Sequence, residues 1–126
     1  YDEGSVSEIY CGHMLEHLTI QDGIKALDYW FTLLKPGGRI SITVPDFDYL
    51  VAQHLAAPNA ESMIEMNEMY IYSYVQESPH RYCYNEALLE EVMVDAGFTN
   101  VEKMPKDHRY FVDAVDWQIG FTGEKP

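Results

Sequence analysis

Hydrophobic side chains recur at helical spacing after Gln21, and the pattern predicts an amphipathic helix over 21–35. The helix is predicted to stop at KPGG (35–38), because Pro36 has the fixed φ of a first turn corner and Gly37 takes the positive φ of a second. One face of this helix is apolar and must pack against another element. The residues of that face are Ile24, Leu27, Trp30, Phe31 and Leu34.

Two short strands are predicted on either side of this helix. Residues 6–11 (VSEIYC) are partly β-branched and aromatic, and they run into Gly12. Residues 39–44 alternate isoleucine and valine with small hydroxyl side chains and end at Pro45. A strand, a helix, a tight turn and a strand form a βαβ unit. The two strands should therefore be parallel, with a right-handed crossover.

The pattern is ambiguous over residues 47–84. Apolar positions allow a short helix from Phe47, a break at Pro58 and Asn59, and a second, methionine-rich helix. The sequence MYIYSYV (69–75) also alternates as a strand would, so its conformation stays open. Methionine and tyrosine of this density are typical of ordinary packing, and they also suit an adaptable lid over a pocket.

The last third of the chain predicts one helix and two strands. Asn85 is placed to cap a helix that Gly97 ends in a left-handed conformation, and FTNVEKM (98–104) is a candidate strand. A final strand with one covered face is indicated by the alternation of Val115, Trp117, Ile119 and Phe121 with polar residues. No repeat or linker divides the chain, so we expect one α/β domain over 1–126.

Composition narrows the class of partner. The 126 residues carry a formal charge of -13, with no cluster of Lys or Arg, which argues against nucleic acid. Cys11 and Cys83 are far apart and fit free thiols in a reducing compartment. No apolar run reaches the ~20 residues that span a bilayer, and no signal sequence is evident. We expect a cytoplasmic protein without a membrane partner. Because the chain begins with Tyr1, we also expect an upstream segment to be missing.

The sequence HMLEH (13–17) matches the HxxEH motif of zinc hydrolases. On a helix, His13 and His17 would share a face and bind zinc, with Glu16 as the general base. Glu90 or Glu91 would supply a further ligand. The helix available for the motif is barely two turns long, however, and the amphipathicity of the downstream helix explains both glutamates. Zinc hydrolysis is therefore an alternative, and no metal is expected.

Three stretches, read in order, resemble another family. They are DEGSVSEIYCGHMLEHL, ALDYWFTLLKPGGRISITVPDF and YNEALLEEVMVDAGFTNVE. Together they resemble the second half of class I S-adenosylmethionine-dependent methyltransferases, most closely the small bacterial type with LEHL, LKPGG and VPD. The resemblance covers residues 2–101. It implies a partial Rossmann-like sheet of strands four to seven with flanking helices, in which DWQIGFTGEKP (116–126) forms the last, antiparallel strand.

The resemblance also implies site residues. Cys11, Gly12 and His13 leave the fourth strand at the rim of the sheet, where similar enzymes place the methionine end of the cofactor and the methyl acceptor. His13 is then a candidate general base or orienting group, with capping of the turn as the equal alternative. Asp46, after the fifth strand, is a second catalytic candidate or simply part of a turn. Glu16 and His17 are expected to fix the turn through hydrogen bonds.

An acceptor pocket is predicted from the sequence HRYCY (80–84). Its candidate lining residues are His80, Arg81, Tyr82 and Tyr84. Arg81 suits an anionic acceptor, although pairing with a surface carboxylate is its commoner fate. Residues 47–84 would then form a helical lid or insertion on the acceptor side. By analogy with the family, we expect a small molecule or a sugar as acceptor.

The family's Gly-rich GxGxG loop and the acidic residue for the ribose are not in this sequence. We therefore expect the chain to be inactive alone, as the cofactor-poor portion of a methyltransferase. A non-catalytic module that dimerises or regulates a full-length relative is the alternative. Without its usual neighbour, strand 6–11 would have a bare edge, which predicts a homodimer or a covering partner.

Overall fold

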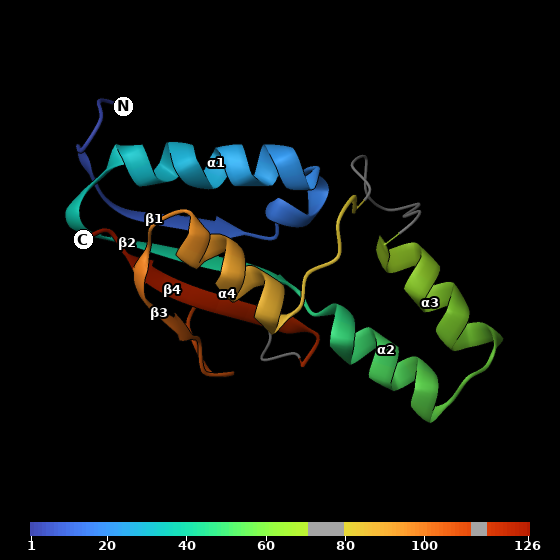
Figure 1. The fold of residues 1–126 in the computed structure, drawn as a ribbon. Helices are drawn as coiled ribbons and strands as arrows, with labels where there is room; N and C mark the ends of the chain where they lie inside the picture. The colour runs from blue at the N-terminus through green and yellow to red at the C-terminus, as the bar shows by residue number, and fades with distance from the viewer. Residues whose placement is uncertain (71–79, 112–115) are drawn as a thin grey trace.

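The computed structural model describes residues 1–70, 80–111 and 116–126, and a four-stranded sheet forms its centre. The strands are β1 (Val6–Gly12), β2 (Leu34–Pro45), β3 (Thr99–Lys103) and β4 (Gln118–Glu124). Their order is β1-β2-β4-β3 (Figure 1). β1 and β2 are parallel, and β4 is antiparallel to both β2 and β3. The predicted α/β class, with an antiparallel last strand, is confirmed.

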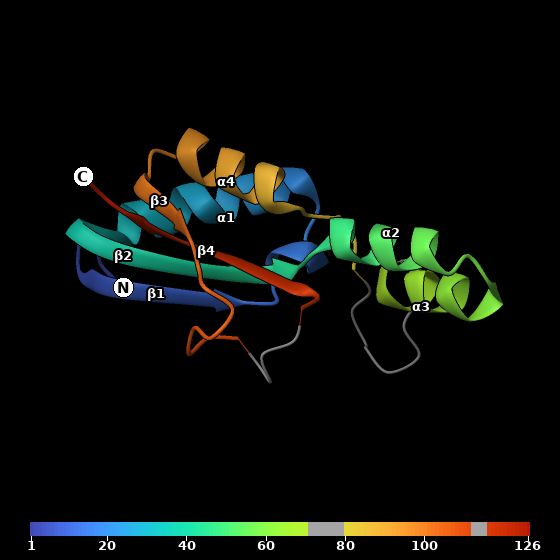
Figure 2. The same cartoon turned by 90° about the horizontal axis from the view of Figure 1, so that it is seen from below.

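Two helices cover the same face of this sheet (Figure 2). α1 (Ile20–Leu33) connects β1 to β2, and α4 (Glu86–Asp95) precedes β3. The side chain of Asn85 accepts a hydrogen bond from the backbone N–H of Leu88 at 2.9 Å, which confirms the predicted cap. Gly97 has a φ of 104°, as a left-handed stop requires. The core between helices and sheet is mainly aliphatic, with a few aromatic rings such as Phe121. Its buried residues include Leu27, Ile40, Ile42, Val44, Leu89, Met93 and Ile119.

The first helix ends two residues earlier than predicted, and the strand after it starts earlier. α1 stops at Leu33, and the β1–β2 ladder already pairs Val6 with Leu34 before it resumes at Glu8 and Arg39. The intervening KPGG residues bulge from the ladder and pair with the C-terminus instead. Gly37 donates its N–H to the carbonyl of Lys125 at 2.8 Å, and its φ of 79° is the predicted positive value.

The last strand is covered on both faces, not on one. Gln118 is as buried as its neighbour Ile119, although the two side chains lie on opposite faces of β4. Helix α4 covers one face of β4, and the segment that follows β3 lies against the other face. Met104 packs close to Gly120 on one face, and Met93 packs close to Gly123 on the other. The part of the predicted strand at Val115 lies outside the described residues.

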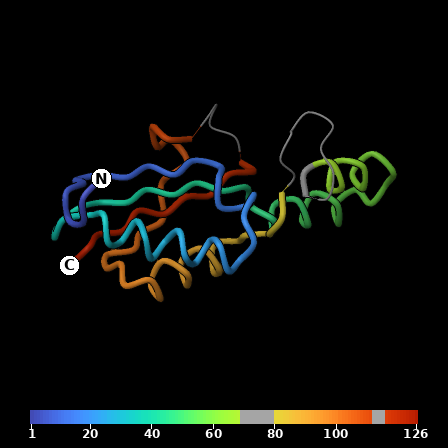
Figure 3. Tube along the Cα trace, turned by 90° about the horizontal axis from the view of Figure 1, so that it is seen from above, coloured from blue at the N-terminus to red at the C-terminus, as the bar shows by residue number. Residues whose placement is uncertain are grey.

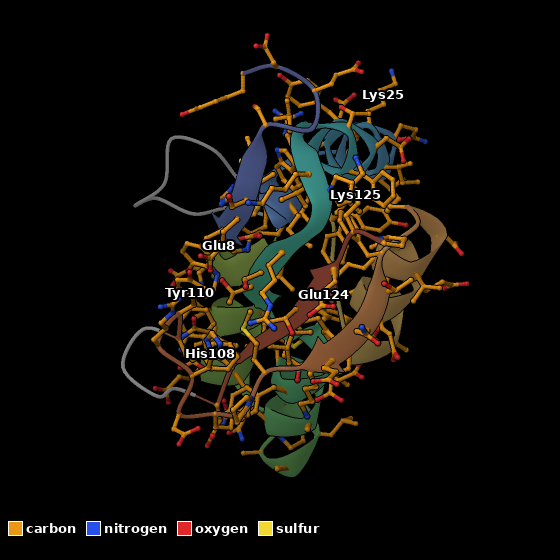
Figure 4. The ribbon with its side chains drawn as sticks, turned by 90° about the vertical axis from the view of Figure 1, so that its left-hand side faces the viewer. Glu8, Lys25, His108, Tyr110, Glu124 and Lys125 are labelled. Atoms are coloured by element: carbon orange, nitrogen blue, oxygen red, sulfur yellow. The ribbon has the colours of Figure 1, made fainter. Side chains whose placement is uncertain are left out.

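The segment after β3 crosses the face of the sheet that the helices leave open (Figure 2). The ring of Tyr110 stacks on Tyr10 of β1, with 3.9 Å between ring centroids. Arg109 forms an ion pair with Glu8 at 3.1 Å, and the Tyr110 hydroxyl lies 3.1 Å from the same carboxylate. Figure 4 shows Glu8, Tyr110 and His108 on one side of the molecule. The segment after β3 therefore shields this face of β1. The outer edge of β1 has no neighbouring strand in the described sheet.

Two further helices project beyond the carboxyl end of β2 (Figures 1 and 3). α2 (Phe47–Ala56) and α3 (Ala60–Tyr70) pack on each other, and the predicted break between them is confirmed. Asn59 caps α3 by accepting the N–H of Ser62 at 2.9 Å. Residues 71–79, with most of MYIYSYV, lie outside the described residues. The longest described helix, α1, has 14 residues, and none of the described helices is long and apolar enough to cross a membrane.

Candidate functional site

The carboxyl ends of the two parallel strands meet at Gly12 and His13. Gly12 pairs with Thr43 of β2, and the backbone N–H of His13 donates to the carbonyl of Thr43 at 2.9 Å. His13 then takes a φ of 50°, in the left-handed region that non-glycine residues rarely adopt. Such strain concentrates at functional sites. The turn lies at the rim where α/β sheets bind their ligands.

The imidazole of His13 is half-buried and has a defined partner. Its Nε2 lies 2.7 Å from Oε1 of Gln118, which is fully buried at the start of β4. The indole of Trp117 lies beside it, with 5.5 Å between ring centroids. Burial lowers the pKa of His13, and the hydrogen bond to Gln118 opposes this shift only in part. We therefore expect a neutral imidazole at pH 7.

A buried carboxyl group lies on the other side of the same ring. The side chain of Glu16 is 1% exposed, and its Oε1 is 3.7 Å from His13 Nδ1 and 3.7 Å from His17 Nε2. Neither carboxylate oxygen has a hydrogen-bond partner among the described residues. The prediction that the Glu16 side chain fixes the turn by hydrogen bonds is therefore wrong. Burial raises the pKa of Glu16 to about 7.

The backbone of Glu16, not its side chain, holds the predicted acceptor segment. Its carbonyl accepts the N–H of Arg81 at 2.6 Å and the N–H of Tyr82 at 3.1 Å. The imidazole of His80 then meets that of His17 edge to face, with 4.6 Å between ring centroids. Burial, with the charges of His17 and His13, lowers the pKa of His80 to about 4. The structure thus brings His80 and His13 to the same glutamate.

The other members of that segment have different environments. The Arg81 side chain is exposed, and Tyr82 is half-buried with its ring 5.7 Å from that of Tyr84. Tyr84 belongs to the core, where burial raises the pKa of its hydroxyl to about 12. Its carbonyl accepts the N–H of Phe47 at 2.9 Å, which ties the segment to the start of α2. Tyr84 is therefore a core residue at this rim, and Arg81 points its charge to solvent.

Asp46 lies at the rim as predicted, at the start of α2. Its Oδ1 accepts the N–H of Asp48 at 3.1 Å, so the carboxylate is the helix cap. Its own N–H donates to the carbonyl of Trp117 at 2.7 Å, which joins the ends of β2 and β4. Burial raises the pKa of Asp46, and the neighbouring Asp48 and Glu86 add to the effect. These contacts of Asp46 are the ones expected if the residue is simply part of a turn, which was the alternative to a catalytic role.

A pocket of about 460 Å³ opens beside the end of β1. Burial raises the pKa of the Cys11 thiol in its wall to about 12, with Glu16 adding to the shift. A side chain at Gly12 would meet the Tyr10 hydroxyl at 2.2 Å, so the close approach of that ring requires glycine. The lining carries no ionised side chain when His13 is neutral. It consists of Ile9, Tyr10, Cys11, Gly12, His13, Met14 and Trp30.

The HxxEH geometry is not formed. His13 lies outside the short 3-10 helix η1 (Leu15–His17), so it does not share a helical face with His17. Glu90 and Glu91 are exposed on α4. The group that could hold a metal within the described part of the chain is Glu16, His17 and His80.

Sequence reasoning missed Gln118, the partner of His13. The alternation in the last strand indicated a solvent-facing side chain at this position, because it predicted only one covered face. The sequence did hold a weak signal for a role of Gln118. An uncharged amide side chain at the rim of the sheet, directly after Trp117, is well suited to orient a polar group. The hydrogen bond between Gln118 and His13 was not predictable from local pattern, because the two residues are 105 positions apart.

The sequence matches a family model, and the fold matches solved structures. The family model of the methyltransferase domain matches residues 2–103. An S-adenosylmethionine-dependent methyltransferase from Thermotoga maritima has a TM-score of 0.66 at 15% identity, with 99% of this chain and 58% of that one covered. One from Archaeoglobus fulgidus has a TM-score of 0.62 at 13% identity, with 98% and 61% covered.

A third similar structure is a Haloferax volcanii protein described as a methyltransferase and solved with the Trm112 methyltransferase activator. Its TM-score is 0.62 at 16% identity, with 100% of this chain and 56% of that one covered. No curated protein sequence matches. The chain spans less than two thirds of each of these structures. At such identities the likeness concerns the fold, and the family rests on the sequence match. Because that match covers most of its 126 residues, the chain belongs to the methyltransferase domain family.

Proposed function

We propose that this chain forms the methionine-side and acceptor-side walls of an S-adenosylmethionine-dependent methyltransferase site. One observation carries the proposal. The pocket at the carboxyl end of β1 is lined by Cys11, Gly12 and His13, in a chain of the methyltransferase family. The sequence contains no GxGxG loop, so we expect these residues alone to bind the cofactor weakly and to transfer no methyl group.

The chemistry of the pocket fits the sulfonium end of the cofactor. The lining has no Lys, Arg, Asp or Glu, and it includes the rings of Tyr10 and Trp30, whose faces attract cations. A neutral His13 does not repel a positive sulfur. The cofactor supplies a methyl group activated by that sulfur. Cys11, Gly12 and His13 would hold its methionine portion.

His13 is the proposed proton acceptor. Its Nε2 is bonded to the Gln118 amide, so an acceptor hydroxyl or amine would take the place of that amide. Against the amide oxygen of Gln118, Nε2 carries the proton of the neutral imidazole. When the acceptor takes the place of the amide, the ring has to adopt the tautomer with its proton on Nδ1, 3.7 Å from Glu16 Oε1, so that Nε2 can receive the proton that the acceptor loses. His80, Tyr82 and the exposed Arg81 would form the acceptor wall, for a small molecule or a sugar. Asp46 remains a second candidate base.

The α2–α3 hairpin is the proposed lid on the acceptor side. It starts directly after the rim at Asp46, and Phe47 is bonded to the backbone of Tyr84 in the predicted acceptor segment. Both cysteines are free thiols, which supports a reducing, cytoplasmic location.

Amide NMR spectra of the full chain with S-adenosylhomocysteine test this proposal. We expect weak binding that shifts the amides of residues 11–14 and the indole of Trp30. Adenosine alone should shift none of these signals, since the glycine loop is absent. A His13→Asn variant should lose the shifts at the rim and keep the rest of its spectrum. Shifts confined to other elements, or micromolar affinity by calorimetry, would contradict the assignment.

A second candidate function is pairing through the bare edge of β1. A pocket of about 310 Å³ lies beside this strand, lined by Tyr1, Val6, Glu8, Ile9, Trp30 and Leu33. An apolar strand edge invites another chain, here a second copy. The Haloferax volcanii structure shows that a protein of this fold can be solved with a partner protein. Such a module would dimerise or regulate a complete relative.

Light scattering over a range of concentrations tests the pairing. We expect a dimer that Ile9→Lys disrupts, because the charge enters the edge pocket. Leu55→Lys is the matched control, since Leu55 is exposed on α2, away from the edge. A monodisperse monomer at high concentration excludes the homodimer.

A further inference from the structure

One carboxylate and two imidazoles converge beside the His13 turn. Glu16, His17 and His80 each offer one ligand atom, and these three atoms lie within 4.8 Å of one another. Glu16 and His17 belong to η1, whereas His80 arrives from a segment more than sixty residues later. The hydrogen bond from the Arg81 N–H to the Glu16 carbonyl places it there. The cluster therefore joins two parts of the rim.

Glu16 supplies a second, independent observation. Its side chain is 1% exposed, and both carboxylate oxygens lack a hydrogen-bond partner among the described residues. Buried polar groups are normally satisfied, and an orphaned carboxylate is strongly disfavoured. Oε1 is directed toward the imidazoles, 3.7 Å from His17 Nε2. A buried carboxylate in this position requires either a proton or a cation.

We propose that Glu16, His17 and His80 bind one divalent transition-metal ion, for which Zn²⁺ is the best match. Two imidazoles and a carboxylate are ligands that zinc prefers, and three protein ligands leave a fourth position open. An ion equidistant from three atoms that are at most 4.8 Å apart lies no more than about 2.8 Å from each. Zn–N and Zn–O distances are about 2.0–2.2 Å, so each ligand atom has to move inward by less than about 1 Å.

This ligand set differs from that of the HxxEH motif, because Glu16 is a ligand and His13 is not. The ion would neutralise the buried carboxylate and cross-link η1 to the segment 80–84. That segment contains the proposed acceptor wall, so the ion would fix its position next to His13. The inference does not depend on methyl transfer, and metal binding is measurable without cofactor or acceptor.

Titration of the tag-free full chain with Co²⁺ and Zn²⁺ tests the site. The protein is first stripped with a chelator, and Co²⁺ serves as the spectroscopic probe. We expect one Co²⁺ per chain, visible absorption bands of a low-coordinate site, and displacement of Co²⁺ by one equivalent of Zn²⁺. Calorimetry then gives the Zn²⁺ affinity.

Single substitutions assign the ligands. Glu16→Gln, His17→Asn and His80→Asn should each weaken Zn²⁺ binding by at least about tenfold, since losing a direct ligand should exceed the effect of losing an outer partner. His54→Asn, on α2, is the matched control and should leave the affinity unchanged. His13→Asn removes an outer partner of Glu16 and should weaken binding less than His17→Asn does. Amide spectra check that each variant folds. If Glu16→Gln fails to fold, the two histidine variants decide.

Three outcomes would overturn the proposal. The first is the absence of stoichiometric binding, which would mean that Glu16 is satisfied by a proton. The second is an affinity that none of the three ligand substitutions changes. The third is an affinity that depends on His13 as strongly as on His17, which would restore the HxxEH ligand set.

Discussion

Helices α4 and α2 are the same length and begin with similar caps, yet only α4 is part of the core. Each has ten residues and an Asn or Asp cap. α4 buries Leu89 and Met93 completely, whereas no residue of α2 is buried and Leu55 is 70% exposed. α4 lies on the sheet, and α2 leads away from it (Figure 2). The difference shows that topology, not apolar content, decides which helix is stabilised by burial.

The contrast has a functional side. The rim residues His13, Gln118 and Glu16 are held by the packed body of the sheet, whereas the proposed lid is built from the hairpin with few buried contacts. Segments with low contact density open at low free energy. A rigid site beside a weakly held cover is the arrangement that ligand entry and closure require.

The largest expected effect separates the two helices directly. Leu89→Ala should lower the free energy of unfolding by about 2–5 kcal/mol, because it removes a fully buried side chain and leaves a cavity. Leu55→Ala, the matched substitution on α2, should change it by no more than about 0.5 kcal/mol. Urea unfolding followed by circular dichroism measures both. Equal losses would show that α2 packs as tightly as α4.

A smaller effect concerns the two thiols and is dependent on pH. Cys11 has a pKa of about 12 in the fold, against an ordinary value of 9.0. Below pH 9 the folded and unfolded states both keep the proton, so the thiol adds no pH dependence. Above pH 9 the unfolded chain loses a proton that the folded chain retains, and the free energy of unfolding falls by up to about 1.4 kcal/mol per pH unit.

Unfolding at pH 8 to 11 measures that slope. Cys11→Ala should reduce it, and Cys83→Ala should reduce it less because Cys83 is exposed. Tyr84, whose pKa is also about 12, contributes to the slope above pH 10 in every variant. A thiol reagent at pH 8 should modify Cys83 first. Equal reaction rates at the two cysteines would argue against the burial of Cys11.

The smallest effect separates the two helix caps. Asn85→Ala should lower the free energy of global unfolding by about 1 kcal/mol, because α4 unfolds with the core. Asp46→Ala should instead speed hydrogen exchange in α2 and leave global unfolding nearly unchanged. Asp46→Asn is the control, since asparagine caps as well as aspartate. If Asp46→Asn weakens the hairpin as much as alanine does, the charge and not the cap is what matters.

Many of the strands and helices were predictable from sequence, since they depend on local pattern. The alternation in 39–44, the cap at Asn85 and the glycine stop at Gly97 each have a nearby physical cause. Boundaries were less certain. α1 ended early because Leu34 joins the β1–β2 ladder, and no local signal reports a ladder partner 28 residues away.

Some features of the candidate site were likewise predictable from sequence, and others were not. The resemblance to the methyltransferase family placed Cys11, Gly12, His13 and Asp46 at the rim, because these residues lie where two predicted strands end. It assigned the Glu16 side chain a hydrogen-bonding role that the fold does not support. It also missed Gln118, because the segment after β3 covers the face of β4 that the alternation left to solvent.

By itself, the sequence determined the order of strands and helices, the family of the chain and the turn in which His13 lies. These follow from periodicity, caps and motifs that act within a few residues. Only the tertiary structure decided that Gln118 meets His13, that Glu16 is buried between imidazoles, and that α2 stays outside the core. Those outcomes depend on contacts between residues far apart in the chain, which form only when the sheet assembles.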